Sequence, residues 1–312
     1  MTRDTLAAAL VDRGLDPAEL EAKRLLFGSV LDAFPAFAGG TPTDAWWIPG
    51  RLEVFGKHTD YGGGHSLIAT VPRGFALGAR GRADGAIRLI DARRAQQVEL
   101  APPYADYSFS GWRHYAHAAA QRLFRNFPGA SLGADIAFAS DLPSASGMSS
   151  SSALVVGLVN ALAHLAGLRD RVEWRANIRT NADAAGYYAC FENGMAFGTL
   201  AGDAGVGTHG GSEDHVAIVC GEAAHVLAWK FVPIEFAGRA AVPPEWTFVI
   251  ASSGVAAQKI GPAMAAYNSV SRRANALLEL WNRSEVRQPS LRAVLHSHPA
   301  ASDRLRSSAI SV

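Results

Sequence analysis

The chain contains the run Asp141-Leu142-Pro143-Ser144-Ala145-Ser146-Gly147-Met148-Ser149-Ser150-Ser151-Ser152-Ala153-Leu154, in which four consecutive serines directly precede an apolar stretch that continues to Leu168. Small residues leave backbone N–H groups open to an anion. The first turn of a helix adds unpaired N–H groups and the positive end of the helix dipole. Serine hydroxyls bind phosphate oxygens or a Mg²⁺ ion that accompanies them. The run therefore indicates a cradle for polyphosphate at the start of a helix over 153–168.

A purely structural role stays open for the same run. Serine is a common N-cap residue, and turns rich in Ser and Gly often do no more than start a helix. The pattern G-x-x-x-x-G-K-[ST] is absent and no lysine is near, so the run is not a Walker A loop. Other parts of the chain have to decide between the two roles.

The composition is that of an ordinary globular protein long enough for about two domains, with 312 residues, 49% hydrophobic and 18% charged. A net charge of +1 argues against a nucleic acid or a membrane surface bound by bulk charge. Cys190 and Cys220 cannot form a disulfide framework or a usual zinc site, and they fit a reducing cytoplasm. Residues 1–14 lack the apolar core of a signal peptide, and 153–168 is too short to span a bilayer.

Apolar periodicity and breaking residues predict a mixture of helices and strands. Helices are expected over 5–13, 17–34, 112–127, 153–168, 171–192 and 263–281. Strands are expected over 45–55, 67–79, 87–100, 134–139, 215–219, 225–231 and 246–251. Segment 194–211 has seven glycines, which predicts a long loop that is flexible or faces a ligand. The pattern favours the α+β class, with a domain boundary near 238–244.

A second polar motif precedes the serine run. The stretch Pro49-Gly50-Arg51-Leu52-Glu53-Val54-Phe55-Gly56-Lys57-His58-Thr59-Asp60-Tyr61-Gly62-Gly63-Gly64 places Arg, Lys, His and Asp in one strand-to-turn segment. Its glycines allow tight backbone geometry around these side chains. Rigidly held donors and acceptors of this kind suit neighbouring sugar hydroxyls. A charged surface hairpin is the alternative.

Together the two motifs resemble the galactokinase branch of the GHMP kinase family. The sugar signature G-R-x-N-x-I-G-E-H-T-D-Y is matched at Gly50, Arg51, Gly56, His58, Thr59, Asp60 and Tyr61. The phosphate loop P-x-G-x-G-L-S-S-S-A is matched at Pro143, Gly147, Ser149, Ser150 and Ser151, with Met148 in place of Leu. The resemblance runs from about residue 46 to 273. It implies a GHMP kinase-like two-domain α+β architecture: an N-terminal domain like ribosomal protein S5 domain 2 over 1–240, and a ferredoxin-like C-terminal domain over 241–312.

The resemblance implies an ATP-dependent, Mg²⁺-requiring sugar kinase. It would phosphorylate galactose or a related hexose or uronic acid, at the anomeric hydroxyl. The residues implied to bind the nucleotide are Pro143, Gly147, Ser149, Ser150, Ser151 and Ser152. Ser150 and Ser151 are the serines expected next to Mg²⁺. Sugar and ATP are the expected partners of a monomer that binds neither nucleic acid nor a membrane.

The family's catalytic Asp lies in a G-I-M-D-Q-like motif, which resembles Gly211-Ser212-Glu213-Asp214-His215 here. Asp214 is therefore the candidate base for the attacking sugar hydroxyl. Arg51 matches the family's Arg near the transferred phosphate, where it would stabilise phosphoryl charge and keep Asp214 ionised. Without the resemblance, Glu-Asp-His at the end of a glycine loop would more often be a solvated turn.

The remaining sugar ligands follow from the same resemblance. His58 and Asp60 are expected to contact sugar hydroxyls. Tyr267 matches a family Tyr near the sugar, although a tyrosine on an ordinary helix face is an equal alternative.

Lys57 replaces the Glu of the family signature, and two explanations compete. A lysine is a cationic donor, so a uronic acid or another sugar with an acceptor at that end would suit it. Alternatively, Lys57 pairs with Glu53, which replaces the family's Asn, and leaves the sugar pocket. We favour the charge swap slightly at this stage.

The sequence also departs from the family near its end. No glycine-rich GAGFGG-like motif follows Arg273, so the C-terminal domain is expected to be incomplete. Two alternatives to an active kinase therefore remain: a non-catalytic regulator that binds sugar and ATP, and an inactive truncated fragment. The intact serine run, Arg51 and Asp214 favour the enzyme.

Overall fold

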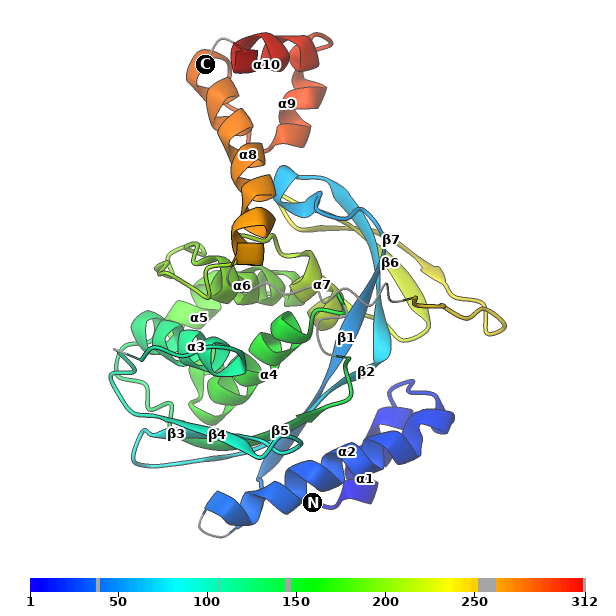
Figure 1. Ribbon diagram of the computed structural model, residues 1–312, viewed down its shortest axis with the longest axis vertical. Helices are drawn as coiled ribbons and strands as arrows, with labels where there is room; N and C mark the ends of the chain where they lie inside the picture. Colours follow the sequence, from blue (N-terminus) through cyan, green and yellow to red (C-terminus); the bar gives the residue numbers. More distant parts are fainter. Residues whose placement is uncertain (38–39, 106, 144–146, 252–261, 311–312) are drawn as a thin grey trace.

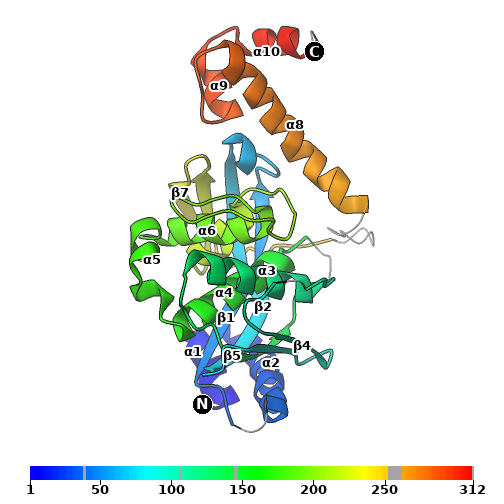
Figure 2. The same ribbon diagram turned by 90° about the vertical axis from the view of Figure 1, so that its left-hand side faces the viewer.

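The computed structural model has one mixed β-sheet with helices on both faces (Figure 1, Figure 2). It describes residues 1–312 except 38–39, 106, 144–146, 252–261 and 311–312. The strands are β1 (Asp44–Phe55), β2 (His65–Gly81), β3 (Ile87–Asp91), β4 (Gln96–Leu100), β5 (Ala134–Ser140), β6 (His225–Lys230) and β7 (Glu235–Ala241). Their order is β4-β3-β5-β2-β6-β7, with β1 beside β2, and all pairs are antiparallel except β3 with β5. The α+β class is confirmed.

Ten α-helices and four 3₁₀ turns lie in the described part of the chain. The α-helices are α1 (Arg3–Val11), α2 (Leu20–Ala33), α3 (Trp112–Asn126), α4 (Ser150–Leu165), α5 (Val172–Asn177), α6 (Asn181–Asn193), α7 (Glu213–Cys220), α8 (Pro262–Ser284), α9 (Leu291–Ser297) and α10 (Ala301–Ile310). The 3₁₀ turns are η1 (Pro17–Glu19), η2 (Phe34–Phe37), η3 (Asp60–Gly62) and η4 (Leu168–Asp170). No helix in the described ranges is long and apolar enough to cross a bilayer.

The core has two layers because side chains alternate between the faces of the sheet. On one face, residues such as Leu77 and Phe138 pack against α3, α4 and α6 in the main apolar cluster. On the other face, Ala76 and Ala139 pack against α2. The two helical layers on opposite sides of the sheet are visible in Figure 1.

Strands β1 and β2 form a long hairpin whose turn contains the second sequence motif. The pairing register shifts between Pro49 and Arg51, where proline has no N–H to donate to the ladder. Gly56 has a φ of +99°, and a Cβ there would lie 2.2 Å from the carbonyl oxygen of His65. Thr59 Oγ1 donates to the carbonyl oxygen of Gly56 at 2.8 Å. The turn is thus a rigid, glycine-dependent structure rather than a loose surface hairpin.

The C-terminal helices have a small apolar cluster of their own, made of Trp281, Val294, Ala301 and Leu305. Helix α8 rises from the body of the molecule, and α9 and α10 fold back at its far end (Figure 1, Figure 2). No strand follows Ala241 in the described residues. The division of the chain at residues 240 and 241 stays a prediction.

Several predicted elements differ from the observed ones. Residues 215–219, expected as a strand, lie in α7, and the helix expected over 171–192 is split into α5 and α6 around Ile178–Thr180. Segment 246–251 is neither strand nor helix. Strand β7 and helices α9 and α10 were not predicted. The glycine-rich segment 194–211 is irregular, as expected, apart from one isolated bridge.

Candidate active site

A cavity of about 1280 Å³ lies where β1, the β1–β2 turn, and the first turns of α4 and α7 meet, with α6 and α8 completing its wall. Among the residues that line it are almost all of those singled out from the sequence: Arg51, Lys57, His58, Asp60, Gly147, Ser149, Ser150, Ser151, Ser152, Asp214 and Tyr267. Pro143 is exposed at the start of the serine run and is not part of the lining. Residues far apart in sequence thus converge on one hollow.

Arg51 and Asp214 form an ion pair in this cavity. The Arg51 Nη2–Asp214 Oδ1 distance is 2.6 Å, and Arg51 Nε donates to the same oxygen at 2.7 Å. The side chains are 11% and 17% exposed, so solvent screens the pair only weakly. Burial by itself would lower the pKa of Arg51, but the charge and hydrogen bond of Asp214 outweigh it and raise this pKa. Arg51 is therefore a permanent cation beside the candidate base.

The serine run is tied to this ion pair by hydrogen bonds. Arg51 Nη1 donates to the carbonyl oxygen of Gly147 at 3.0 Å, and the Arg51 N–H donates to the carbonyl oxygen of Met148 at 3.4 Å. Gly50 permits this close approach, because a Cβ there would lie 2.5 Å from Leu142 and 3.2 Å from the Met148 oxygen. The first motif and the second motif are therefore parts of one structure.

Ser149 bears on the two roles left open for the run. It is the N-cap residue of α4, with a left-handed backbone (φ 56°, ψ 44°), and its side chain makes no capping hydrogen bond. Its Oγ is buried and has no hydrogen-bond partner among the described residues. An ordinary N-cap serine accepts a hydrogen bond from the N2 or N3 backbone N–H. The simple capping explanation is therefore wrong for Ser149, and its hydroxyl is left for another partner.

Ser152 points towards carboxylates. Its Oγ donates to Glu192 Oε1 at 2.7 Å, and it lies 3.4 Å from Asp214 Oδ2. Glu192, on α6, also accepts from Thr208 Oγ1 at 3.2 Å. Ser150 and Ser151, the serines expected next to Mg²⁺, line the cavity on the preceding positions. Sequence reasoning did not find Glu192, because its position beside Ser152 depends on the packing of α6 against α4.

Asp60 connects the β1–β2 turn to the start of α7. Its Oδ2 accepts the backbone N–H of Glu213 at 3.1 Å. A Cβ on Gly211 would lie 2.1 Å from the same oxygen, so only glycine fits there. Asp60 thus serves as an N-terminal partner of the helix that presents Asp214. Burial raises the pKa of Asp60, and this effect outweighs the hydrogen bond from Glu213, which lowers it.

His58 and Tyr267 lie side by side at the wall of the cavity. Their ring centroids are 5.5 Å apart in an edge-to-face arrangement, and the Tyr61 ring is 6.1 Å from His58. His58 has a φ of +58°, a strained value for a non-glycine residue. Tyr267 therefore lines the cavity, and its role in binding stays a prediction.

Lys57 is an exposed part of the cavity wall. Within the described residues it has no ion pair with Glu53, whose Oε2 lies 3.5 Å from Arg51 Nη2 instead. The charge swap between Lys57 and Glu53, favoured slightly from the sequence, is therefore not formed, because Glu53 faces the arginine two residues before it. Lys57 thus remains a lining residue of the cavity.

Glu213 is a buried carboxyl that sequence reasoning passed over in favour of its neighbour Asp214. It is 4% exposed, and its Oε2 accepts the Ser66 hydroxyl at 2.8 Å. Burial, and then the charges of Glu53 and Asp60, raise its pKa well above the usual range. The site therefore holds a carboxylate that pairs with Arg51 and, next to it in sequence, a buried carboxyl whose raised pKa favours the neutral form.

The serine run and the β1–β2 turn lie in segments that match known protein families. Residues 114–194 match the model of the GHMP kinases N terminal domain, and residues 33–80 match the galactokinase galactose-binding signature. A galactokinase of Streptomyces coelicolor is 35% identical over 143 residues, which is 45% of this chain and 37% of that protein. A galactokinase of Chloroflexus aggregans is 34% identical over 133 residues, 42% of this chain and 33% of that protein. The chain thus spans about a third of the length of the curated relatives it matches.

The fold comparison points the same way. The crystal structure of Lactococcus lactis galactokinase complexed with galactose has a TM-score of 0.58 to this chain at 19% identity, over 82% of this chain and 62% of that one. The fold and the matched N-terminal segment are those of the GHMP kinases. Over the segments that match, the chain is similar to the galactose-binding signature of galactokinases and to the galactokinase relatives.

Proposed function

We propose that this chain transfers the γ-phosphoryl group of ATP to a sugar of the galactose type, at the anomeric hydroxyl. The observation that supports this most directly is the Arg51–Asp214 pair, which is hydrogen-bonded to the serine run on one side and faces the β1–β2 turn on the other. A phosphate on the serine run and a sugar on the turn would meet at Asp214.

The residues of the serine run fit a nucleotide with Mg²⁺. The unpartnered Ser149 Oγ, the open left-handed Gly147 and the start of α4 offer donors to phosphate oxygens. Within the described residues, no group of three or more His, Cys, Asp or Glu could hold a metal ion alone. This suits Mg²⁺, which is usually held by one or two protein oxygens together with substrate phosphates. Glu192 and Ser152 are the proposed protein oxygens, with Ser150 and Ser151 beside them.

An apolar wall of the same cavity suits the purine. Trp112, Tyr115, Phe138 and Leu142 line the part of the cavity beyond the serine run. Aromatic and aliphatic side chains of this kind bury the flat face of a base. The nucleotide would thus extend from this wall to the Arg51–Asp214 pair.

In the proposed mechanism Asp214 accepts the proton of the anomeric hydroxyl while that oxygen forms its bond to the γ-phosphorus. The bond from the γ-phosphorus to the bridging oxygen breaks, and ADP leaves with its electron pair. Arg51 keeps Asp214 ionised and places a fixed positive charge beside the transferred group. Mg²⁺, when bound, supplies further neutralisation of phosphate charge. Most of the rate enhancement would come from positioning and electrostatics.

The sugar would be held by the β1–β2 turn. His58, Asp60 and Tyr267 offer a ring edge, a carboxyl and a phenol around one end of the cavity. Lys57 adds a cation where the family signature has Glu. Because this cation has no ion pair with Glu53, we propose that it faces the sugar and favours a carboxylate or another strong acceptor there.

The test is a coupled ADP-release assay on this chain with galactose, galacturonate and glucose. We expect ADP release with galactose-type sugars only, and a kcat/KM for galacturonate at least equal to that for galactose. Lys57→Glu should reverse this preference by about tenfold or more. The exposed Arg125 of α3, outside the lining of the cavity, gives the matched control Arg125→Glu, which should leave the preference unchanged.

Two outcomes would contradict different parts of the proposal. If galactose is phosphorylated and galacturonate is not, the role of Lys57 is wrong and the kinase stands. If sugar and ATP bind, as followed by calorimetry, but no sugar releases ADP, the chain is a binding protein rather than a kinase.

A further inference from the structure

A second cavity, of about 310 Å³, lies between the end of β6, the residues that follow η3, and α9. We call it the basic pocket. Its charged lining residues are His65, Lys230, Glu235, Arg292 and His296. The catalytic cavity shares none of its lining residues with this pocket. In Figure 1 and Figure 2 the tip of the β1–β2 hairpin approaches the lower end of the C-terminal helices.

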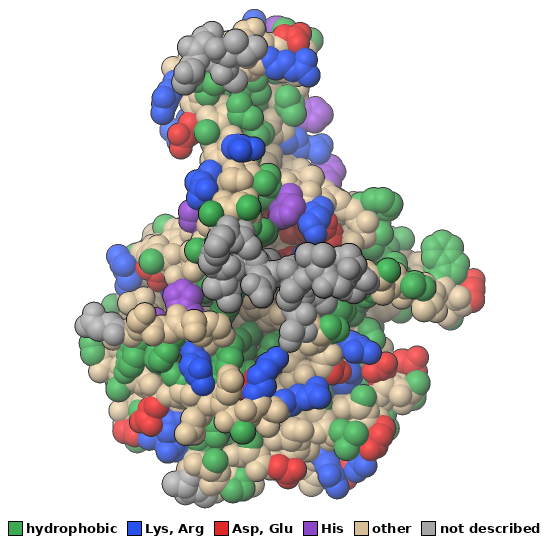
Figure 3. Space-filling model, in the orientation of Figure 1, with side chains coloured by type: hydrophobic (Ala, Val, Ile, Leu, Met, Phe, Trp, Pro, Cys, Tyr) green, Lys and Arg blue, Asp and Glu red, His purple; other side chains and the backbone are tan. Residues whose placement is uncertain are grey.

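Basic side chains outnumber carboxylates in the basic pocket, and Lys230 and Arg292 supply its permanent positive charges. Four basic side chains face one carboxylate, that of Glu235. Within the described residues none of the four forms an ion pair within 4 Å, although Lys230 and Glu235 are cross-strand neighbours. Burial, followed by the charges of Arg292, Lys230 and His296, lowers the pKa of His65. Figure 3 shows Lys, Arg and His side chains where the C-terminal helices meet the body of the molecule.

The walls of the basic pocket are held together by close packing. Gly63 has a φ of +80°, and a Cβ there would lie 2.3 Å from Ser290 Oγ. Ser290 Oγ in turn accepts the Ala293 N–H at 3.2 Å and starts α9. The Phe231 N–H donates to the carbonyl oxygen of Gly64 at 3.1 Å. Three segments from distant parts of the sequence are thus fixed around the same cations.

Lys230 and Arg292 place two positive charges at the basic pocket, where they attract a counter-ion. A concave surface of one sign concentrates ions of the opposite sign. Arginine offers a planar fork that matches phosphate oxygens, and lysine adds a compact charge. The volume is at the lower end of the range for small-ligand sites. The size and the charge therefore suit a small dianion rather than a nucleotide.

We propose that the basic pocket binds a phosphate group, as free phosphate or as a small phosphate ester, through Lys230 and Arg292 with the imidazoles of His65 and His296. This site is separate from the proposed catalytic cavity and does not depend on the proposed kinase activity. Its occupancy would join α9 to the β2–β6 part of the sheet.

The probe for the test is inorganic phosphate, followed through the imidazole NMR signals of His65 and His296 at constant ionic strength. We expect a saturable shift of both signals and a higher pKa for His65 in the presence of phosphate, because a bound dianion offsets the surrounding cations. Glycerol phosphate is then tested in place of phosphate. If glycerol phosphate binds more tightly, the site is one for a phosphate ester. If phosphate binds more tightly, the site is one for the free ion. Acetate should bind at least tenfold more weakly, since it has a single charge.

The variants are Lys230→Gln and Arg292→Gln, with Arg125→Gln as the matched control. Arg125 is an exposed arginine of α3, outside the lining of the pocket. Each pocket variant should weaken phosphate binding about tenfold, and the control should leave it unchanged. The proposal is overturned if phosphate causes no shift at either histidine. It is equally overturned if the pocket variants bind phosphate as the unaltered chain does, or if Arg125→Gln weakens binding as much as they do. Circular dichroism of all three variants checks that the fold is retained.

Discussion

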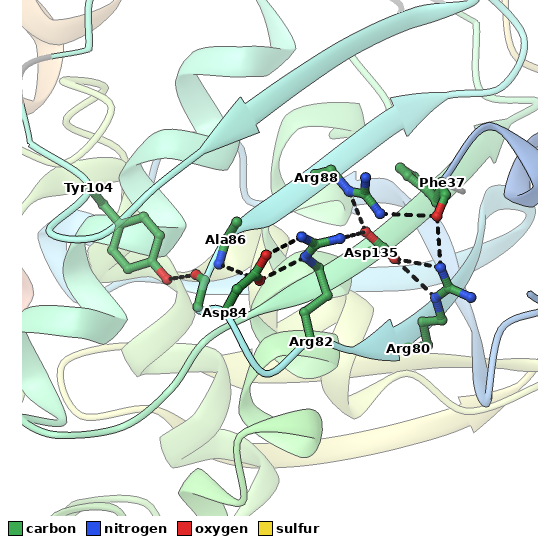
Figure 4. Close-up of polar contacts among 9 residues, drawn as sticks. Phe37, Arg80, Arg82, Asp84, Ala86, Arg88, Tyr104 and Asp135 are labelled. Atoms are coloured by element: carbon green, nitrogen blue, oxygen red, sulfur yellow. Dashed lines mark hydrogen bonds and ion pairs between the residues drawn. The ribbon is translucent and has the colours of Figure 1, made fainter. Parts of the chain in front are cut away.

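Two arginine–aspartate clusters in this chain have the same chemistry and opposite surroundings. Arg51 and Asp214 lie on the wall of a large cavity, where both side chains keep some exposure. Asp135, by contrast, is 1% exposed and is surrounded by three arginines at the other end of β2 and β5 (Figure 4). The comparison distinguishes an ion pair that stabilises the fold from an ion pair that is accessible to a substrate.

The oxygens of Asp135 are all used by the protein. Oδ1 accepts from Arg88 Nε at 2.7 Å and from Arg82 Nη1 at 3.1 Å, and Oδ2 accepts from Arg80 Nε at 3.0 Å. The spare N–H groups of Arg80 and Arg88 donate to the carbonyl oxygen of Phe37, at 2.9 and 3.1 Å (Figure 4). This cluster joins the segment after α2 to the sheet. Its groups are satisfied internally, so it has no capacity left for a substrate.

The lesson is that charge alone does not define the site. The Asp135 cluster has more arginines than the Arg51 cluster, yet it does not line either cavity. What distinguishes Arg51 and Asp214 is their access to a hollow that also contains the unpartnered Ser149 hydroxyl. We therefore expect substitutions in the first cluster to change kinetics and those in the second to change stability.

The largest expected effect is that of Asp214→Asn on turnover. The amide cannot accept the proton of the sugar hydroxyl, so kcat should fall by about 10²- to 10⁴-fold. ATP binding, measured by calorimetry, should survive. Asp135→Asn, the matched change in the second cluster, should leave kcat per folded molecule unchanged. Equal losses of kcat in both variants would remove the distinction between the clusters, and normal turnover in Asp214→Asn would exclude Asp214 as the base.

The next effect is on stability, in the opposite cluster. Asp135→Asn leaves three half-buried arginines without their shared carboxylate, which should cost about 3 to 5 kcal/mol in the free energy of unfolding. Burial alone would raise the pKa of Asp135, but hydrogen bonds from Arg88 and Arg80 outweigh it and hold this pKa below its usual range.

The pH dependence of that loss has a definite sign. A carboxyl whose pKa is lowered by folding stabilises the protein above its unfolded pKa, and this contribution disappears as the pH falls through its folded pKa. The difference in stability between the unaltered chain and Asp135→Asn, measured by urea unfolding, should therefore be full near neutral pH and shrink below about pH 4. A difference that stays constant down to strongly acidic pH would mean that the ion pairs of Asp135 contribute little.

The smallest expected effect is that of Glu213→Gln on the stability of the chain, and it compares Glu213 with its neighbour Asp214. Folding raises the pKa of Glu213 above the usual 4.5 of a glutamate, so above that pH the folded chain keeps a proton that the unfolded chain has lost. Stability should then fall as the pH rises above about 4.5, until Glu213 ionises in the folded state. Glu213→Gln, which keeps the shape without the ionisation, should be more stable than the unaltered chain by about 1 to 3 kcal/mol near pH 8 and nearly equal to it near pH 5.

The control for this prediction is Glu245→Gln, a change at an exposed position. It should not alter the slope of stability against pH in urea unfolding. If Glu213→Gln has the same slope as the unaltered chain, Glu213 does not hold a proton in the folded state, and the contrast with Asp214 is lost.

The sequence by itself determined the features that depend on short stretches of chain. The serine run with its following helix, and the glycine-bounded polar turn, are local patterns, so their residue types already indicated phosphate and sugar chemistry. Arg51 and Asp214 were identified through the resemblance of these patterns to a family, and the structure places the two side chains 2.6 Å apart. The helices α3, α4 and α8 and the strands β1, β2, β5 and β6 were also foreseen, because each is long or clearly bounded.

Only the tertiary structure decided the features whose partners lie far away in sequence. Residues 215–219 are too short for their period to distinguish strand from helix, and α7 starts where Asp60, about 150 residues earlier, accepts the Glu213 N–H. Of the two explanations left open for Lys57, the pairing with Glu53 is not formed, because the fold turns Glu53 towards Arg51. Ser152 meets Glu192 only because α4 packs against α6. The basic pocket likewise exists only where α9 reaches the sheet. Local propensity depends on neighbouring residues, so the sequence reveals it. The hydrogen-bond partners and the burial of the site residues depend on the packing of the whole chain.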